Sequence, residues 1–243
     1  MDAITEIILV LFLSAVLSIV AVRVKLLTPS GAVTALIVGL ILGIAGSLYW
    51  LVTVVAFAVM GFMATKLNFS EKKSKGIQEG KSGERTGKNV LGVALPGCIF
   101  ALINLYSEDK YYFILSIGFI ATIAVAAADT IASELGTRDA NVWMITTLKK
   151  VLPGTDGGIS VLGTSLSFMG SAVAVILGWG LIFGLSFNAL MIIPILSGFA
   201  GCLLDSLLGA TLETEGRITK YFNNMSTGLM GGIMAVIFVG ILS

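Results

Sequence analysis

Long apolar runs alternate with short polar segments along the whole of this chain. The apolar runs lie at about 4–22, 32–46, 48–65, 90–105, 111–128, 158–182, 187–210 and 228–242. A helix needs about 20 residues to cross a bilayer, within a range of about 17–25. The second, fourth and eighth runs are shorter, so we expect their helices to extend into polar flanks or to tilt. The pattern predicts about eight transmembrane helices, with seven or nine as alternatives.

The composition supports a membrane protein. Of the 243 residues, 56% are hydrophobic and 12% are charged, whereas soluble domains carry about 25% charged residues. A chain this apolar is neither an ordinary soluble globule nor a disordered polymer. We therefore predict an all-α polytopic helical bundle that forms one domain over residues 1–243. The first six residues carry no basic side chain, so we expect the first helix to be retained rather than cleaved as a signal peptide.

Several kinds of chemistry are excluded or disfavoured. The net charge of +1 offers no basic field for nucleic acid. The chain has no His, which removes His catalysis and the commonest zinc ligand. Both cysteines, Cys98 and Cys202, lie within apolar runs, so we expect them to be buried and unpaired.

Basic residues follow the predicted topology. If the N-terminus lies outside the cell, 14 of the 15 Lys and Arg residues fall in inner segments and only Lys110 falls outside. This distribution obeys the positive-inside rule. The inner loops, at about 66–89, 129–157 and 211–227, carry almost every polar group. We therefore expect a multi-pass protein of the cell membrane whose active site faces the cytoplasm.

Three acids stand at or near the inner ends of predicted spans. Asp129 and Glu134 follow the fifth apolar run, and Asp205 lies near the end of the seventh. Carboxylates of this kind suit Mg²⁺, which is commonly held by one or two carboxylates together with substrate phosphates. Asp129 and Glu134 are about 140° apart around an ideal helix, so they cannot share a ligand unless the helix ends between them. The alternative for each acid is an ion pair with a loop Lys or Arg.

Polar helix starts recur at the same end of the bundle. Four spans are expected to begin there, after Ser30, Thr86, Asp156 and Thr227, each followed by Gly. Such ends are either ordinary N-caps or anion-binding sites. The segment at 154–158 contains more glycines than a helix cap requires, so we predict that this glycine-rich segment binds phosphate. Its residues are Gly154, Thr155, Asp156, Gly157 and Gly158.

The loop at 66–89 contains seven basic and three acidic residues. It is either a solvated loop attracted to anionic headgroups or a phosphate clamp. The residues nearest the next helix are the best placed to reach a site. They are Arg85, Lys88 and Asn89.

This inventory fits phosphoryl transfer, which depends mainly on positioning and charge stabilisation. A phosphate monoester acceptor is already anionic near neutral pH, since its second pKa is about 6. Such an acceptor needs no general base, which suits a chain without His. An alcohol acceptor would need one, and Asp129 or Asp205 would have to serve.

Three segments, in this order, resemble the signatures of the phytyl-phosphate/prenyl-phosphate kinase family of integral membrane proteins. They span 127–136 (AADTIASELG), 154–160 (GTDGGIS) and 201–210 (GCLLDSLLGA). The resemblance implies transfer of the terminal phosphoryl group of CTP to a prenyl monophosphate. It also implies catalytic and metal roles for Asp129, Glu134 and Asp205. Phosphate contacts are implied for Arg85, Lys88 and Asn89, for the glycine-rich segment and for Ser206.

The expected partners are CTP with Mg²⁺, a prenyl monophosphate such as phytyl or geranylgeranyl phosphate, and membrane lipids. No nucleic acid is expected, and self-association stays open. Two other classes also stay open. A lipid cytidylyltransferase, like the CDP-lipid synthases, would use the same nucleotide and acids but release pyrophosphate. A transporter would show no dependence on a nucleotide.

Overall fold

The computed structural model describes residues 2–242, and eight of its helices are long and apolar enough to cross a membrane. This confirms the predicted number of spans. The helices are α1 (Ala3–Arg23), α2 (Pro29–Ile41) with its π-helical extension Leu42–Gly46, α3 (Leu48–Lys66), α5 (Gly87–Leu105), α6 (Tyr112–Leu135), α7 (Val161–Phe183), α8 (Ile192–Leu208) with its π-helical extension Gly209–Glu213, and α9 (Lys220–Leu242). A short helix, α4 (Phe69–Ser74), lies in the loop before α5.

The three short apolar runs do extend into polar sequence. The corresponding spans are Pro29–Gly46, Gly87–Leu105 and Lys220–Leu242. The last of these begins eight residues before the apolar run, so its first two turns are polar.

Helix starts differ from the expected pattern at three of four places. Thr86 does cap α5, in a capping box with Asn89. The prediction is wrong for Ser30, because Thr28 caps α2. It is wrong for Asp156, because Ser160 caps α7, and for Thr227, which lies inside α9. A hydroxyl before Gly is too common a pair to fix a cap when another hydroxyl stands nearby.

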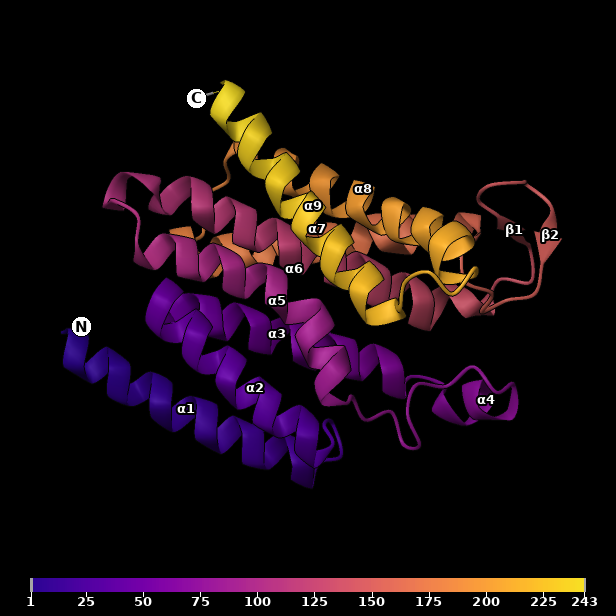
Figure 1. The fold of residues 1–243 in the computed structure, drawn as a ribbon, viewed down its shortest axis with the longest axis horizontal. Helices are drawn as coiled ribbons and strands as arrows, with labels where there is room; N and C mark the ends of the chain where they lie inside the picture. The colour runs from indigo at the N-terminus through magenta and orange to yellow at the C-terminus, as the bar shows by residue number, and fades with distance from the viewer. Residues whose placement is uncertain (1, 243) are drawn as a thin grey trace.

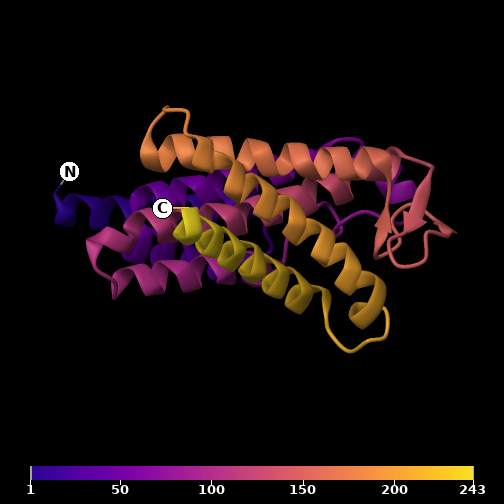
Figure 2. The same cartoon turned by 90° about the horizontal axis from the view of Figure 1, so that it is seen from above.

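The polar connections gather at one end of the bundle, and both termini lie at the other (Figure 1). Figure 2 shows the same separation from above. The loop boundaries need correction, because α6 continues to Leu135 and α9 starts at Lys220. The segment between α6 and α7 also holds a small antiparallel sheet in the order β2-β1-β3, with strands Val142–Met144 (β1), Lys150–Val151 (β2) and Gly158–Ile159 (β3). Strands of two or three residues leave no hydropathy pattern, so the sequence did not predict them.

Helix α6 forms the centre of the bundle. In its apolar window 72% of the residues are buried, against 11% in α1. Phe119 of α6 stacks on the buried Trp50 of α3, with ring centroids 4.2 Å apart. Cys98 and Cys202 are free and buried, as expected. Because α6 is surrounded by other helices, most of its side chains face protein and not lipid.

Candidate active site

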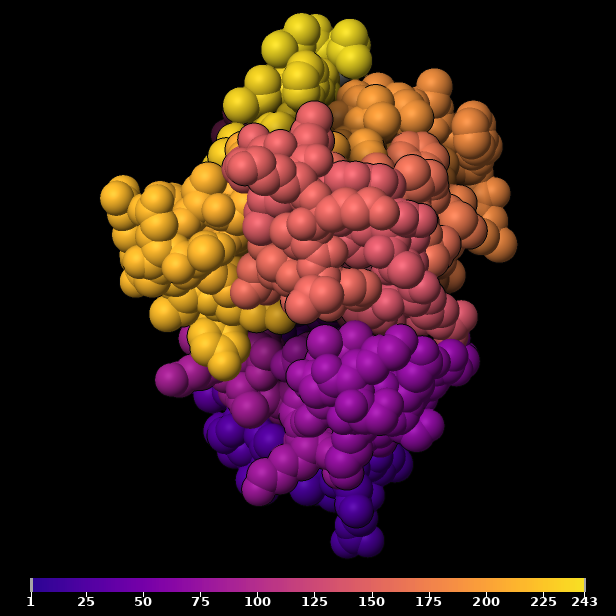
Figure 3. Space-filling model, turned by 90° about the vertical axis from the view of Figure 1, so that its right-hand side faces the viewer, coloured from indigo at the N-terminus to yellow at the C-terminus, as the bar shows by residue number. Residues whose placement is uncertain are grey.

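A cavity of 310 Å³ opens at the polar end of the bundle. Three loops meet there: the purple segment before α5, the salmon segment between α6 and α7, and the amber turn between α8 and α9 (Figure 3). Nine of the twelve residues predicted from the sequence line this cavity. They are Asp129, Glu134, Gly154, Thr155, Asp156, Gly157, Gly158, Asp205 and Ser206. The structure therefore brings together residues that are up to 77 positions apart (206 − 129).

Asp129 and Asp205 enter the cavity from two different helices, α6 and α8. The Asp129 carboxylate makes no hydrogen bond or ion pair with another residue in the described range 2–242, so both of its oxygens are available to a ligand. Asp205 is held from α9, because the Thr227 hydroxyl donates to its Oδ1 at 3.3 Å. The Asn224 amide, turned so that its nitrogen faces Asp205, donates to the same oxygen at 3.3 Å. Only one oxygen of Asp205 is engaged in this way.

The donor set fits a magnesium ion that also contacts substrate. Across residues 2–242 no three Cys, Asp or Glu side chains form a group that could enclose a metal. Mg²⁺ seldom uses such a cage, and binds through one or two carboxylates together with phosphate oxygens and water. Asp129, with both oxygens available, and Asp205, with one, suit that mode of binding.

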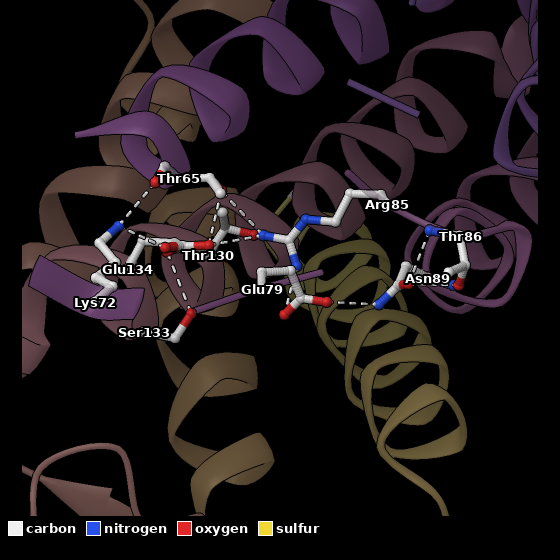
Figure 4. Close-up of polar contacts among 9 residues, drawn as sticks. All are labelled: Thr65, Lys72, Glu79, Arg85, Thr86, Asn89, Thr130, Ser133 and Glu134. Atoms are coloured by element: carbon white, nitrogen blue, oxygen red, sulfur yellow. Dashed lines mark hydrogen bonds and ion pairs between the residues drawn. The ribbon is translucent and has the colours of Figure 1, made fainter. Parts of the chain in front are cut away.

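Glu134 sits in a buried network of ion pairs (Figure 4). Its Oε2 accepts from Lys72 Nζ at 2.6 Å, and its Oε1 accepts from Arg85 at 2.9 Å and from the Thr65 hydroxyl at 2.7 Å. Lys72 also donates to the carbonyl oxygens of Ala64 and Thr65 at the end of α3, at 2.9 and 3.1 Å. Both carboxylate oxygens of Glu134 therefore have cationic partners, which matches the ion-pair alternative. Its metal role stays a prediction.

The continuity of α6 explains why the side chains of Glu134 and Asp129 have different surroundings. The helix does not end between them, so the two side chains leave it in different directions. Asp129 faces the open cavity, whereas Glu134 faces α3 and α4 and touches only the cavity wall.

The three remaining predicted residues do not line the cavity. Arg85 contacts Glu134 and, through its other terminal nitrogen, Glu79 at 2.9 Å. Asn89 donates to Glu79 at 3.2 Å and closes the capping box of α5 (Figure 4). Lys88 is exposed on the outside of α5. Glu79 itself lines the cavity. Arg85 and Asn89 therefore hold a carboxylate of the cavity wall in place without lining the cavity themselves.

Backbone contacts place Arg85 where it reaches Glu134. The backbone of Arg85 bridges Leu26 and Thr28, with N···O distances of 2.9 and 3.0 Å. In the turn before Arg85, the Ser82 backbone N–H donates to the Glu84 carboxylate at 2.6 Å. The backbone N–H groups of Glu84 and Ser82 lower the pKa of this carboxyl. Gly31 packs directly against the Arg85 carbonyl, because a Cβ at Gly31 would lie 2.5 Å from that oxygen.

Replacing Gly31 by Ala is therefore expected to shift Arg85 and to destabilise the protein by about 1–3 kcal/mol. The thermal unfolding temperature in detergent measures this effect. The control is Gly240→Ala, an exposed position inside α9 where the nearest atom to a Cβ, Cδ1 of Ile114, lies 3.7 Å away. A Gly31→Ala protein as stable as the wild type would contradict the packing.

Close packing requires one glycine of the glycine-rich segment. Gly157 has a φ of +75°, and a Cβ there would lie 2.8 Å from the backbone nitrogen of Ala210 in the extension of α8. This close approach fixes the segment against α8 next to Asp205. The backbone N–H groups of Asp156 and Gly157 donate to no other residue of the described chain. Both groups are thus available to an anion in the cavity.

Three charged residues of the cavity were not assigned to it from the sequence: Glu79, Glu213 and Lys220. Glu213 lies eight residues after Asp205, which on an ideal helix separates them by about 12 Å. The π-helical turn Gly209–Glu213 changes that spacing and directs Glu213 to the cavity and to the Asn223 amide, 3.2 Å away. Lys220 falls within the predicted inner loop 211–227, whereas in the structure it begins α9.

Fold and cavity together define a polytopic membrane protein with an acidic, glycine-lined cavity at one end of its helices. The chain belongs to the family described as integral membrane protein DUF92, whose model matches residues 12–240. It is 34% identical to the membrane protein sll0875 of Synechocystis over 192 residues, which are 79% of this chain and 74% of that protein.

Other relatives come from archaea and plants. The Methanocaldococcus jannaschii membrane protein MJ0933 is 29% identical over 98% of this chain and 96% of its own length. The chloroplastic protein VTE6 of Arabidopsis thaliana is 26% identical over 87% of this chain and 65% of its own length. Family membership confirms the resemblance that the three motifs indicate. No solved structure matches this chain.

Proposed function

We propose that this protein is a prenyl-phosphate kinase that transfers the terminal phosphoryl group of CTP to a membrane-embedded prenyl monophosphate. One observation carries the proposal. Two carboxylates from separate spans, Asp129 and Asp205, share a cavity with a glycine-rich segment at the end of an apolar bundle. The family membership and the similarity to the chloroplastic protein VTE6 support it.

The residues that line the cavity are sufficient for the proposed reaction. An oxygen of the prenyl monophosphate attacks the γ-phosphorus of CTP, the bond between that phosphorus and the β–γ bridging oxygen breaks, and CDP leaves. The acceptor oxygen is already deprotonated near neutral pH, because the second pKa of a phosphate monoester is about 6. Positioning and charge stabilisation then supply the catalysis.

Each group of cavity residues has its own role in the proposed reaction. Asp129 and Asp205 would hold Mg²⁺, which supplies charge stabilisation for the phosphate oxygens when bound. The free N–H groups of Asp156 and Gly157 donate to phosphate oxygens, and the Ser206 hydroxyl stands beside Asp205 to do the same. Glu134 fixes the loop before α5, through Lys72 and Arg85, as one wall of the cavity.

The location of the cavity suits a substrate with one polar and one apolar end. Asp129 and Asp205 lie in the last turns of membrane-spanning helices, so a phosphate at the membrane boundary can reach them while its tail stays among apolar side chains. The positive-inside rule orients this end toward the cytoplasm, where CTP is available. The membrane is proposed to be the cell membrane.

The proposal predicts a defined pair of products. Purified protein with CTP, Mg²⁺ and phytyl or geranylgeranyl monophosphate is expected to yield the prenyl diphosphate and CDP, separated by chromatography. Chelation of Mg²⁺ with EDTA is expected to stop the reaction, and excess Mg²⁺ to restore it. Release of pyrophosphate with a CDP-linked lipid would instead identify a lipid cytidylyltransferase.

A further inference from the structure

We propose that Lys220 binds phosphate oxygens of a substrate in the cavity, an inference that rests on the proposed function and extends it. Seven charged residues line the cavity, and the acids are Glu79, Asp129, Glu134, Asp156, Asp205 and Glu213. Within residues 2–242, Lys220 is the one Lys or Arg in this lining. A cavity so rich in carboxylates repels a polyphosphate unless cations offset the charge.

The other cations near the cavity are already paired. Lys72 donates to Glu134 and to two backbone carbonyl oxygens, and it is only 5% exposed. Arg85 is shared between Glu79 and Glu134. Neither side chain can reach a phosphate without breaking a partly or fully buried ion pair, which is costly.

Lys220 is different, because its ammonium group has no hydrogen bond or ion pair within the described chain. Its side chain is exposed to the cavity at the first residue of α9. The acids whose charges act most strongly on it are Asp129, Glu79 and Asp156, which come from α6, the loop before α5 and the glycine-rich segment. None of these three carboxylates forms a hydrogen bond or ion pair with the ammonium group.

This arrangement leaves a place for a phosphate group. A metal ion on Asp129 and Asp205 would supply positive charge on one side of the phosphate, and Lys220 would supply it on the other. Lys is well suited here, because it is a compact point charge on a flexible stem that can follow a group in transfer. The start of α9 adds the positive end of a helix dipole in the same direction.

Binding of Mg²⁺-pyrophosphate to the purified protein tests this role without relying on activity. Ligand-dependent shifts of the thermal unfolding temperature give the affinity of each variant. Lys220→Met is expected to weaken binding about 10- to 100-fold, as for a lost charge-assisted hydrogen bond. Lys220→Arg is expected to stay within about fivefold of the wild type, because it keeps the charge. Lys149→Met is the matched control, since Lys149 is exposed at the same end and does not line the cavity.

Kinetics then identify the phosphate that Lys220 contacts. A raised KM for CTP assigns the residue to the triphosphate, and a raised KM for the prenyl monophosphate assigns it to the acceptor. A Lys220→Met protein with wild-type affinity for Mg²⁺-pyrophosphate and wild-type KM for both substrates would overturn the inference, as would a wild-type protein that binds no pyrophosphate. If Lys220→Met loses stability without ligand, Lys220→Gln replaces it in the same comparison.

The inference and the proposed function can fail separately. If the wild type and Lys149→Met bind pyrophosphate, Lys220→Met does not, and none forms a prenyl diphosphate, the phosphate role of Lys220 stands and the kinase proposal falls. If prenyl diphosphate forms, and Lys220→Met keeps the wild-type rate, the wild-type KM for both substrates and the wild-type affinity for pyrophosphate, the kinase stands and the role of Lys220 falls.

Discussion

Replacing Asp205 by Asn is expected to lower turnover at least about 10²- to 10³-fold while the protein stays folded. The amide has nearly the same shape as the carboxylate, and its oxygen can still accept from the Thr227 hydroxyl. It loses the negative charge that would hold a divalent cation against the phosphates. The same result is expected for Asp129→Asn. Rates of prenyl diphosphate formation at saturating CTP and Mg²⁺ measure the effect.

The matched control is Asp109→Asn, which makes the same chemical change at an exposed position near the other end of the bundle. Its turnover and its thermal unfolding temperature are expected to equal those of the wild type. An Asp205→Asn enzyme with near-normal turnover would remove Asp205 from the reaction and with it the carboxylate pair on which the mechanism depends.

Replacing Lys72 by Met is expected to be the most damaging single change to stability. It leaves Glu134 without one of its cations, and it removes the donor for two carbonyl oxygens at the end of α3. Breaking a buried pair from one side costs about 3–5 kcal/mol. At roughly 2–4 °C per kcal/mol for a chain of this size, the unfolding temperature should fall by about 10 °C.

A second lysine of the same short helix provides the control for this change. Lys75 pairs with Glu71 at 2.7 Å, but both side chains are about half exposed. Exposed pairs contribute about 0–1 kcal/mol, so Lys75→Met should leave the unfolding temperature almost unchanged. Equal stability of the Lys72→Met and wild-type proteins would mean that the network is not structural, and it would favour a metal role for Glu134.

Much of the fold was predictable, because lipid imposes a simple rule on sequence. Any backbone inside the bilayer must satisfy its own hydrogen bonds, so each long apolar run becomes a helix. Asp129 and Asp205 were predictable as site residues for a related reason. An acid within an apolar run is costly unless it serves a ligand or a partner, and these two stand at the ends of such runs.

The surroundings of Glu134 and Lys220 could not be predicted in the same way. Glu134 pairs with a lysine 62 positions away, and no local pattern specifies which of seven basic residues in that loop is chosen. Lys220 precedes a polar stretch that hydropathy assigns to a loop, although it forms the first two turns of α9. Contacts with α8, such as the hydrogen bond from Thr227 to Asp205, stabilise this polar part of α9. These contacts depend on tertiary packing, which the sequence alone does not reveal.

The position of a label in the lipid product tests the central claim most directly. Purified protein is supplied with phytyl or geranylgeranyl monophosphate, Mg²⁺ and CTP labelled at either the α- or the γ-phosphate. The account predicts that the γ-label enters the lipid and the α-label stays in CDP, and that Asp205→Asn lowers both the transfer and the release of CDP at least about 100-fold. Entry of the α-label into the lipid, or no labelled lipid from the wild-type protein, would contradict it.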